Sequence, residues 1–231
     1  MKHKINIRGV MIPNDYKFFY DFMGIDSTCP ADVQKVLDAF QNGDEIEVYI
    51  NSPGGVIDVG SEIYTLLRSN KDHVKIYITG EACSAASIVA MAGYCEMAPT
   101  ALMMVHCVST RASGNHSDME HAAEMLQTAD QALCTAYTAK SGMTQQEALD
   151  MMEEETWLTA EQAKERGLVD AVMFEKEESV PLVAGPLFSL PTTEQMEKVK
   201  RMLKDAGSES DDAAFLIQAK LNLLKMRGER E

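Results

Sequence analysis

The chain has 231 residues, of which 45% are hydrophobic and 25% are charged, and its formal net charge at pH 7 is −15. This length and composition are typical of a folded protein with one substantial core and an appendage. The acidic balance argues against nucleic acid and against an anionic membrane as the main partner, because both require a basic surface.

The sequence shows no targeting, disulfide, metal or nucleotide signal. No stretch approaches the ~20 apolar residues of a membrane span, and the first residues lack the apolar run of a signal peptide, so we expect a cytoplasmic protein. No Walker-type phosphate loop and no metal-ligand spacing is present, so we expect no metal and no cofactor. The cysteines are odd in number and include no C-x-x-C pair, which favours free thiols: Cys29, Cys83, Cys95, Cys107 and Cys134.

Strand and helix signals alternate along most of the chain, which predicts right-handed βαβ units and an α/β fold. An aromatic-rich segment from Pro13 to Ile25 has no clear periodicity. The predicted strands are Lys4 to Ile12, Ile46 to Ile50, Val74 to Ile78, Ala101 to Val105 and Val169 to Phe174. The predicted helices start near Pro30, after Gly55, at Ser84, near Asp118, at Thr144 and at Thr159.

A run of small residues from Gly80 to Ser87 follows the third predicted strand and leads into an apolar helix. Such a turn can hold the hydroxyl of Ser84 at the exposed start of that helix. The free N–H groups there can stabilise an oxyanion. Read alone, the run also fits a buried helix packed closely on a sheet.

A histidine and a group of acidic residues are candidates to act together with Ser84. His106 ends the predicted strand one unit later, and neighbouring strands of an α/β unit end on the same side, so Ser84 and His106 can meet. Acidic residues that precede Trp157 can supply a carboxylate to orient the imidazole, which is the logic of nucleophilic acyl transfer: Asp150, Glu153, Glu154 and Glu155. Cys83 and Cys107 adjoin the serine and the histidine, so a cysteine nucleophile is also considered.

Several motifs in order resemble the family of Clp protease proteolytic subunits, over about Glu45 to Phe174. They are Ile50-Asn51-Ser52-Pro53-Gly54-Gly55, Gly80-x-Ala82-x-Ser84-x-Ala86 with Gly93, Met104-Val105-His106, Trp157-Leu158-Thr159-Ala160 and Gly167-Leu168-Val169-Asp170. The resemblance implies a ββα-spiral, crotonase-like fold with a protruding handle helix at Asp118 to Lys140, and a serine peptidase built as homo-oligomeric rings, heptameric or stacked.

The resemblance also implies the roles of individual residues. Ser84 is the expected nucleophile and His106 the general base, and the backbone N–H groups of Gly55 and Ala85 are the expected oxyanion donors. Ser87, one helical turn further on, is the competing serine. The third member departs from the family, because Glu155 stands where the family has aspartate; Glu154 and Asp150 remain alternatives.

The ends of the chain point to one branch of the family. The family's N-terminal axial loops, which meet an unfoldase ATPase, have no room before the first strand. Beyond a peptidase domain at 1–174 and a linker at 175–192, residues 193–231 are predicted to form a helical extension. These features resemble phage and prophage head maturation proteases. They imply an ATP-independent endopeptidase that cleaves scaffold or capsid proteins in the bacterial or phage-infected cytoplasm.

Rival readings stay open at this point. The chain would otherwise be an ATPase-dependent proteolytic subunit, or a catalytically silent ring or scaffold subunit. A crotonase-type acyl-CoA enzyme shares the fold but needs no Ser–His pair. A Ser–Lys dyad would require Lys71 or Lys75, which lie before or on the strand that precedes Ser84. His116 and His121 are expected on the surface, and His3 and His73 have no evident partner.

Overall fold

The computed structural model describes residues 1–41, 43–175, 196–198 and 200–201. The chain divides into two units, Met1–Lys176 and Glu177–Glu231. The predicted linker and helical extension lie almost entirely outside the described residues, and the division into domain, linker and extension stays a prediction. No helix in the described part is long and apolar enough to cross a membrane.

The first unit is built on a mostly parallel sheet with the strand order β2-β1-β3-β4-β5-β8. These strands are β1 (Lys2–Met11), β2 (Ser27–Thr28), β3 (Glu45–Gly55), β4 (Val74–Cys83), β5 (Tyr94–Met97) and β8 (Ala171–Val172). Strand β6 (Leu102–Val105) pairs in parallel with the end of β4. Strand β7 (Thr156–Leu158) pairs with β6 in the antiparallel direction.

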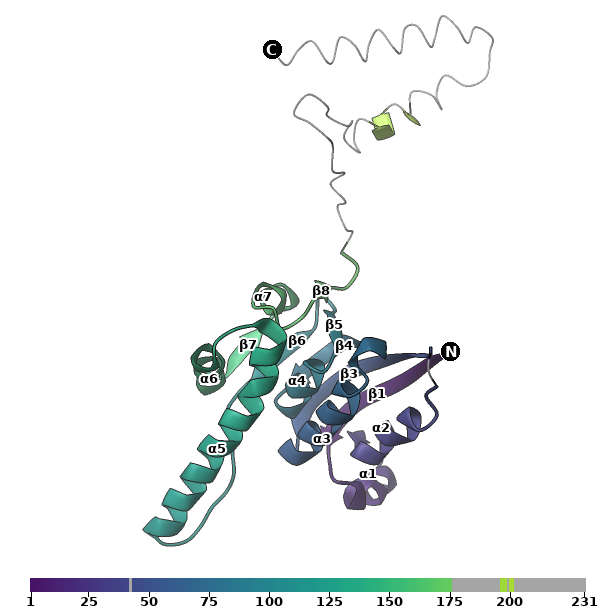
Figure 1. Ribbon diagram of the computed structural model, residues 1–231. Coiled ribbons are helices and arrows are strands. Elements are labelled where there is room, and N and C mark those ends of the chain that lie inside the picture. Colours follow the sequence, from purple (N-terminus) through teal and green to yellow (C-terminus); the bar gives the residue numbers. More distant parts are fainter. Residues whose placement is uncertain (42, 176–195, 199, 202–231) are drawn as a thin grey trace, which may run out of the picture. The chain divides into compact units, whose positions relative to one another are not determined.

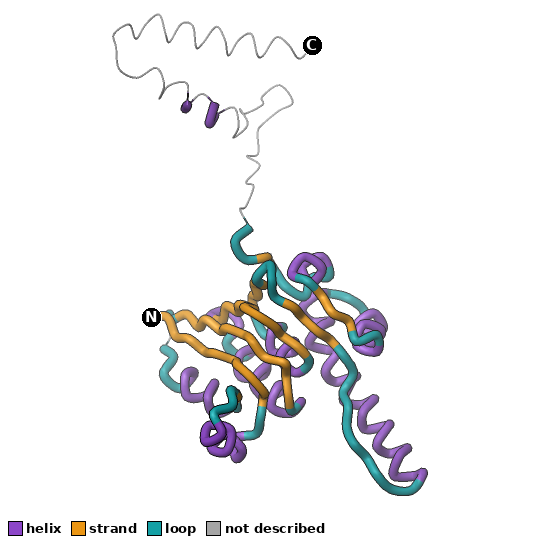
Figure 2. Tube along the Cα trace, turned by 180° about the vertical axis from the view of Figure 1, so that it is seen from behind, coloured by secondary structure: helices purple, strands orange, loops and turns teal. Residues whose placement is uncertain are grey.

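Helices join the strands of the sheet (Figure 1). They are α1 (Lys17–Met23), α2 (Pro30–Leu37), α3 (Ile57–Arg68), α4 (Ala85–Ala90), α5 (His116–Ser141), α6 (Gln145–Glu153) and α7 (Ala160–Glu165), with 3₁₀ turns at Asn14–Tyr16 and Lys71–His73. Figure 2, turned by 180°, shows the strands in front of α3 and α4. The mixed α/β architecture with a parallel sheet confirms the predicted fold class.

The core forms between the sheet and α3 and α4 because their apolar faces match. Helix α3 buries Val59, Ile63 and Leu67 at helical spacing. Strands β3 and β4 contribute fully buried isoleucines and valine to the same core: Ile46, Val48, Ile50, Ile76 and Ile78. The predicted helix starts at Thr144 and Thr159 are confirmed as capping boxes, in which each threonine side chain accepts an N–H of the first turn.

Several elements differ from the sequence prediction. The aromatic segment before Ile25 contains helix α1, which buries none of its own residues and leaves Phe18 and Phe22 exposed. Strand β4 continues to Cys83, and the last strand shrinks to Ala171–Val172. Strands β5 and β7 were not expected, because each is short and gains its hydrogen bonds only from a neighbour distant in sequence.

Helix α5 extends well away from the sheet (Figure 1). It begins after Asn115, whose side chain accepts hydrogen bonds from two backbone N–H groups of the first turn. Its buried residues, Cys134, Ala136 and Tyr137, all lie near its C-terminal end. Met119 and Met125, towards its start, are exposed. Within the described chain, the first half of this helix therefore contributes no residue to the buried core.

The remaining histidines are placed as follows. His116 and His121 are exposed on α5, as expected. His3, which had no partner at the sequence level, has one: its Nε2 lies 2.7 Å from Oδ2 of Asp44. The ring of His73 lies against Phe40, with centroids 5.2 Å apart.

Candidate active site

Ser84 occupies the turn between β4, which ends at Cys83, and α4, which begins at Ala85. Its backbone angles are φ 54° and ψ −126°, a strained conformation for a residue with a side chain. Although Ser84 is the N-cap residue of α4, its hydroxyl caps no N–H of the helix. The hydroxyl is therefore left to interact with a group outside the helix.

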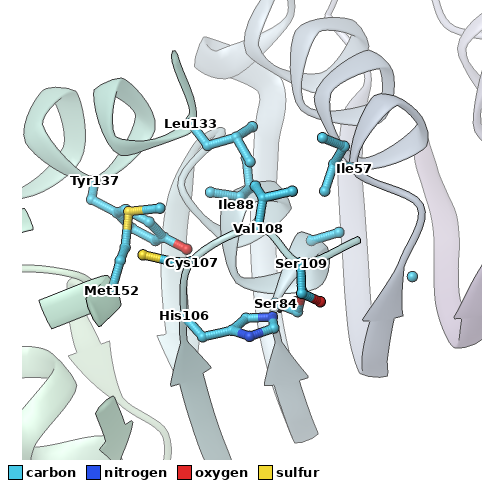
Figure 3. A pocket seen from close by; sticks show the side chains of 12 residues that line it. Ile57, Ser84, Ile88, His106, Cys107, Val108, Ser109, Leu133, Tyr137 and Met152 are labelled. Carbon is cyan, nitrogen blue, oxygen red and sulfur yellow. Dashed lines mark hydrogen bonds between the residues drawn. The ribbon is translucent and has the colours of Figure 1, made fainter. Parts of the chain in front are cut away.

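That group is His106. Its Nε2 lies 2.7 Å from Oγ of Ser84, within hydrogen-bond distance. The topology explains the meeting: β6 pairs in parallel with the end of β4, and the Ser84 N–H donates to the Met104 carbonyl at 2.9 Å. In Figure 3 the imidazole lies beside Ser84 at the edge of a cavity. An unprotonated Nε2 can accept the hydroxyl proton in this geometry.

Glycines allow the chain to pass close to this turn. A Cβ atom on Gly54, where φ is +93°, would lie 2.6 Å from the Cys83 carbonyl oxygen and 2.8 Å from Cβ of Ser84. A Cβ on Gly60 of α3 would lie 2.9 Å from Cβ of Ala85. The backbone at Gly54 therefore approaches the serine turn more closely than any other residue type would permit, and that at Gly55 packs equally closely on Met11 of β1.

Replacing Gly54 by alanine is expected to lower kcat/KM for peptide hydrolysis by about 10²-fold, because the added methyl group must displace the Ser84 turn. Gly142→Ala is the matched control: its φ of +77° is equally unfavourable for alanine, but nothing lies within 4 Å of the added Cβ. The control is expected to lose stability and keep its activity. Equal losses of activity in the two variants would contradict the steric explanation.

A cavity of about 70 Å³ adjoins the serine and the histidine. The residues that line it come from the two turns at Gly55 and Ser84, from the segment after β6 and from helices α3, α4, α5 and α6: Gly55, Ile57, Ser84, Ala85, Ile88, His106, Cys107, Val108, Ser109, Leu133, Tyr137 and Met152. A larger hollow of about 650 Å³ shares Gly55, Ile57 and Val108 and extends along α5 past Met125 and Ala129.

Glu155 lies at the start of the strand that pairs with the histidine's own strand. The pairing of the two strands ends at Val105 and Thr156, so His106 and Glu155 are the next residues beyond the last pair. Glu155 has a left-handed φ of 48° and accepts a hydrogen bond from Nε1 of Trp157 at 3.4 Å. Within the described residues no hydrogen bond or ion pair joins a carboxylate to His106.

The two alternative carboxylates have less favourable positions. Asp150 accepts a hydrogen bond from Nε2 of Gln146 on the exposed side of α6, at 2.7 Å. Glu154 is the C-cap residue of α6 and is exposed. Both belong to α6 or its C-terminal end, whereas Glu155 directly precedes β7.

Comparison with known proteins is decisive for the family. Residues 26–176 match the family model described as Clp protease. The chain belongs to the Clp protease family. Two relatives named "ATP-dependent Clp protease proteolytic subunit", from two strains of Bacteroides fragilis, are each 33% identical to it over 143 residues. That segment covers 61% of this chain and 69% or 65% of the relative.

The Clp protease family is one of serine peptidases, and the rival nucleophiles of this chain fit that chemistry poorly. Burial raises the pKa of the Cys83 thiol to about 12 and that of the Cys107 thiol to about 11. Both are protonated at neutral pH, whereas a cysteine nucleophile acts as the thiolate. Ser87 is fully buried and its hydroxyl is engaged with the Ser84 carbonyl and with Tyr137.

Two side chains beside this Clp protease site were not singled out from the sequence. Oδ1 of Asp130, on α5, accepts a hydrogen bond from the Val108 N–H at 2.7 Å and so holds the segment that follows His106. Tyr137, on the same helix, reaches the cavity. Neither lies in a local motif, although Tyr137 is the one tyrosine, phenylalanine or tryptophan in the α5 sequence.

The described residues contain no group of three or more His, Cys, Asp or Glu side chains placed to hold a metal ion. Lys75, considered for a Ser–Lys dyad, forms an ion pair with Glu96 at 2.7 Å. Lys71 lies in the 3₁₀ turn before β4 and is exposed. At the edge of the cavity the hydroxyl of Ser84 and the imidazole of His106 are within hydrogen-bond distance of each other.

Proposed function

We propose that this Clp protease family member is a serine endopeptidase with Ser84 as nucleophile and His106 as general base. The observation that carries the proposal is the 2.7 Å contact between Oγ of Ser84 and Nε2 of His106, at a strained turn beside an open cavity. In this mechanism His106 takes the hydroxyl proton while Oγ attacks the peptide carbonyl. His106 then gives that proton to the leaving amine, and water hydrolyses the acyl-enzyme.

The oxyanion of the tetrahedral intermediate is assigned to the backbone N–H groups of Gly55 and Ala85. Both residues line the cavity with Ser84. The Ala85 N–H is the first of helix α4 and so has no partner inside the helix. Two N–H donors that already point at the site of the developing negative charge stabilise it without reorganisation.

Glu155 is proposed as the residue that orients His106. The pairing of β6 and β7 supports this role, since His106 and Glu155 directly adjoin its last pair, Val105 and Thr156. The role requires the Glu155 carboxylate to leave Trp157 and cross the gap to the imidazole. The extra methylene of glutamate relative to aspartate helps to span that gap.

The two hollows suggest how a peptide is held. The 70 Å³ cavity, with Ile88, Leu133 and Met152 on its walls, suits a small or medium apolar side chain next to the scissile bond. The larger hollow along α5 would take neighbouring residues of the substrate. Asp58 at its border and the net charge of −15 favour neutral or cationic peptides.

A fluorophosphonate probe tests the proposal directly. We expect the purified protein to be labelled, and peptide mapping by mass spectrometry to place the adduct on Ser84 and not on Ser87. Absence of labelling in a folded, oligomeric sample would contradict the peptidase proposal. That result, together with intact assemblies and no peptide turnover, would favour the silent ring or scaffold subunit.

The finer proposal is an ATP-independent head maturation protease of phage or prophage type, acting on scaffold or capsid proteins as a homo-oligomeric ring. The glutamate at the third position supports this branch, and so does the long segment beyond residue 176, where the family match ends. The unburied first half of α5, with Met119 and Met125 exposed, supports association with further copies of the chain.

An ATPase-dependent proteolytic subunit is the second candidate. The two Bacteroides fragilis relatives favour it, because both are named as ATP-dependent proteolytic subunits. Cleavage of an unfolded protein and of a folded protein, each with and without a Clp-type unfoldase and ATP, separates the two. The head maturation proposal expects the same rates in both conditions. Cleavage of the folded protein that requires the unfoldase and ATP would favour the second candidate.

A further inference from the structure

A buried chain of hydrogen bonds leads from helix α5 to the backbone of Ser84. The hydroxyl of Ser87 donates to the Ser84 carbonyl oxygen at 2.6 Å. The hydroxyl of Tyr137 lies 2.7 Å from that of Ser87. Ser87 is fully buried and Tyr137 is 1% exposed, so both contacts lie inside the protein. Figure 3 shows the Tyr137 ring reaching the cavity from α5.

Only one direction of hydrogen bonding satisfies both contacts. Each hydroxyl carries a single hydrogen, and the Ser84 carbonyl can only accept. The Ser87 hydroxyl must therefore donate its hydrogen to the carbonyl, and the Tyr137 hydroxyl must donate to the oxygen of Ser87. Burial raises the pKa of Tyr137, so its phenol stays protonated and remains a donor. The hydrogen bonds run in one direction, which strengthens each of them.

The group at the end of this chain belongs to a catalytic peptide unit. The Ser84 carbonyl and the Ala85 N–H are part of one planar trans peptide, in which the two bonds point in opposite directions. The carbonyl also accepts the backbone N–H of Ser87 at 2.9 Å, so the Ser87 hydroxyl is a further contact that fixes it. Fixing the carbonyl fixes the direction of the N–H. The proposed function assigns that N–H to the oxyanion, and the inference that follows rests on that assignment.

We propose that Tyr137 and Ser87 are positioning residues that hold the Ser84–Ala85 peptide so that its N–H points at the oxyanion of the substrate. The strained angles at Ser84 explain the need, since a residue held at φ 54° requires surrounding contacts to keep it there. Because Tyr137 lies on α5, the relay also ties the nucleophile turn to that helix, 50 residues further along the chain.

Tyr137→Phe removes only the donor hydroxyl and keeps the ring that fills the core. We expect kcat for a peptide substrate, and the rate of fluorophosphonate labelling, each to fall by about 10-fold or more, with KM changed by less than about 3-fold. Tyr64→Phe is the matched control, because that partly buried tyrosine makes no hydrogen bond through its hydroxyl within the described residues. It is expected to keep wild-type rates.

The double variant separates positioning from stability. Ser87→Ala leaves the Tyr137 hydroxyl buried without a partner, so it is expected to lower both the melting temperature and kcat. Adding Tyr137→Phe removes the unpaired hydroxyl and is expected to restore much of the melting temperature, while kcat stays low. Recovery of kcat together with stability would overturn the positioning role and leave a structural one.

A transition-state analogue gives a second readout. A peptide aldehyde forms a tetrahedral adduct on a serine nucleophile, whereas the matching peptide alcohol binds without bond formation. Tyr137→Phe is expected to weaken aldehyde binding by about the factor lost in kcat, and alcohol binding by much less. Equal weakening of the two would overturn the relay. Wild-type protein that neither binds the aldehyde covalently nor labels with the fluorophosphonate would instead defeat the proposed function itself.

Discussion

Substituting alanine for Ser84 is expected to lower kcat for peptide hydrolysis by about 10⁴- to 10⁶-fold and to abolish fluorophosphonate labelling. The hydroxyl is the only nucleophile that meets His106 at hydrogen-bond distance among the described residues, and removal of a serine nucleophile alone costs rates of this order in other serine peptidases. Steady-state hydrolysis of a fluorogenic peptide measures the loss.

The fold of Ser84→Ala should be unaffected by the loss of the hydroxyl. Ser84 makes its structural hydrogen bonds through its backbone N–H and carbonyl, to Met104 and to the start of α4. Its positive φ is strained in either variant. The oligomeric state should therefore match that of the wild type. Residual turnover within 10-fold of wild type, after exclusion of contaminating peptidases, would refute Ser84 as the nucleophile.

Ser87→Ala provides the contrast that the sequence alone left open. Both serines lie in one run of small residues, three positions apart, and either hydroxyl suits the start of a helix. The structure separates them: Ser84 contacts His106, whereas Ser87 is fully buried against Ser84 and Tyr137. Loss of Ser87 should thus reduce labelling by a smaller factor and leave the adduct on Ser84.

The meeting of Ser84 and His106 could be predicted because it follows from local patterns and one rule of topology. A small-residue turn at the end of one strand and a histidine at the end of a later strand lie together when the two strands are parallel neighbours, as β4 and β6 are. The glycine turn at Gly54 is equally local, since its positive φ can be expected from residue type alone.

The rest of the site depends on contacts that carry no local signal. Tyr137 reaches Ser87 across 50 residues of sequence, and Asp130 caps the N–H of Val108 across 22. Strand β7 is three residues long and exists through its pairing with β6. The aromatic segment before Ile25 gave no clear pattern either: it forms helix α1, which buries none of its residues and leaves Phe18 and Phe22 exposed.

Replacing Glu155 by alanine is expected to lower kcat by about 10³-fold with little change in KM, because a histidine base without its orienting carboxylate loses the correct tautomer and the partner of its positive charge. The position of Glu155 next to Thr156, whose partner Val105 directly precedes His106, is the basis of this expectation. Glu155→Asp should retain more activity than Glu155→Ala, since the family pattern has aspartate there.

Glu154→Ala and Asp150→Ala are the matched controls, and each is expected to stay within about 2-fold of wild-type kcat, in line with ordinary surface substitutions. Both carboxylates are exposed, and that of Asp150 is already bound to Gln146. Trp157→Phe tests the second half of the argument. It removes the indole N–H that binds the Glu155 carboxylate and leaves that carboxylate free to reach the imidazole, so kcat should be maintained or raised. A fall in kcat as large as that of Glu155→Ala would mean that the carboxylate acts through Trp157 and not on His106.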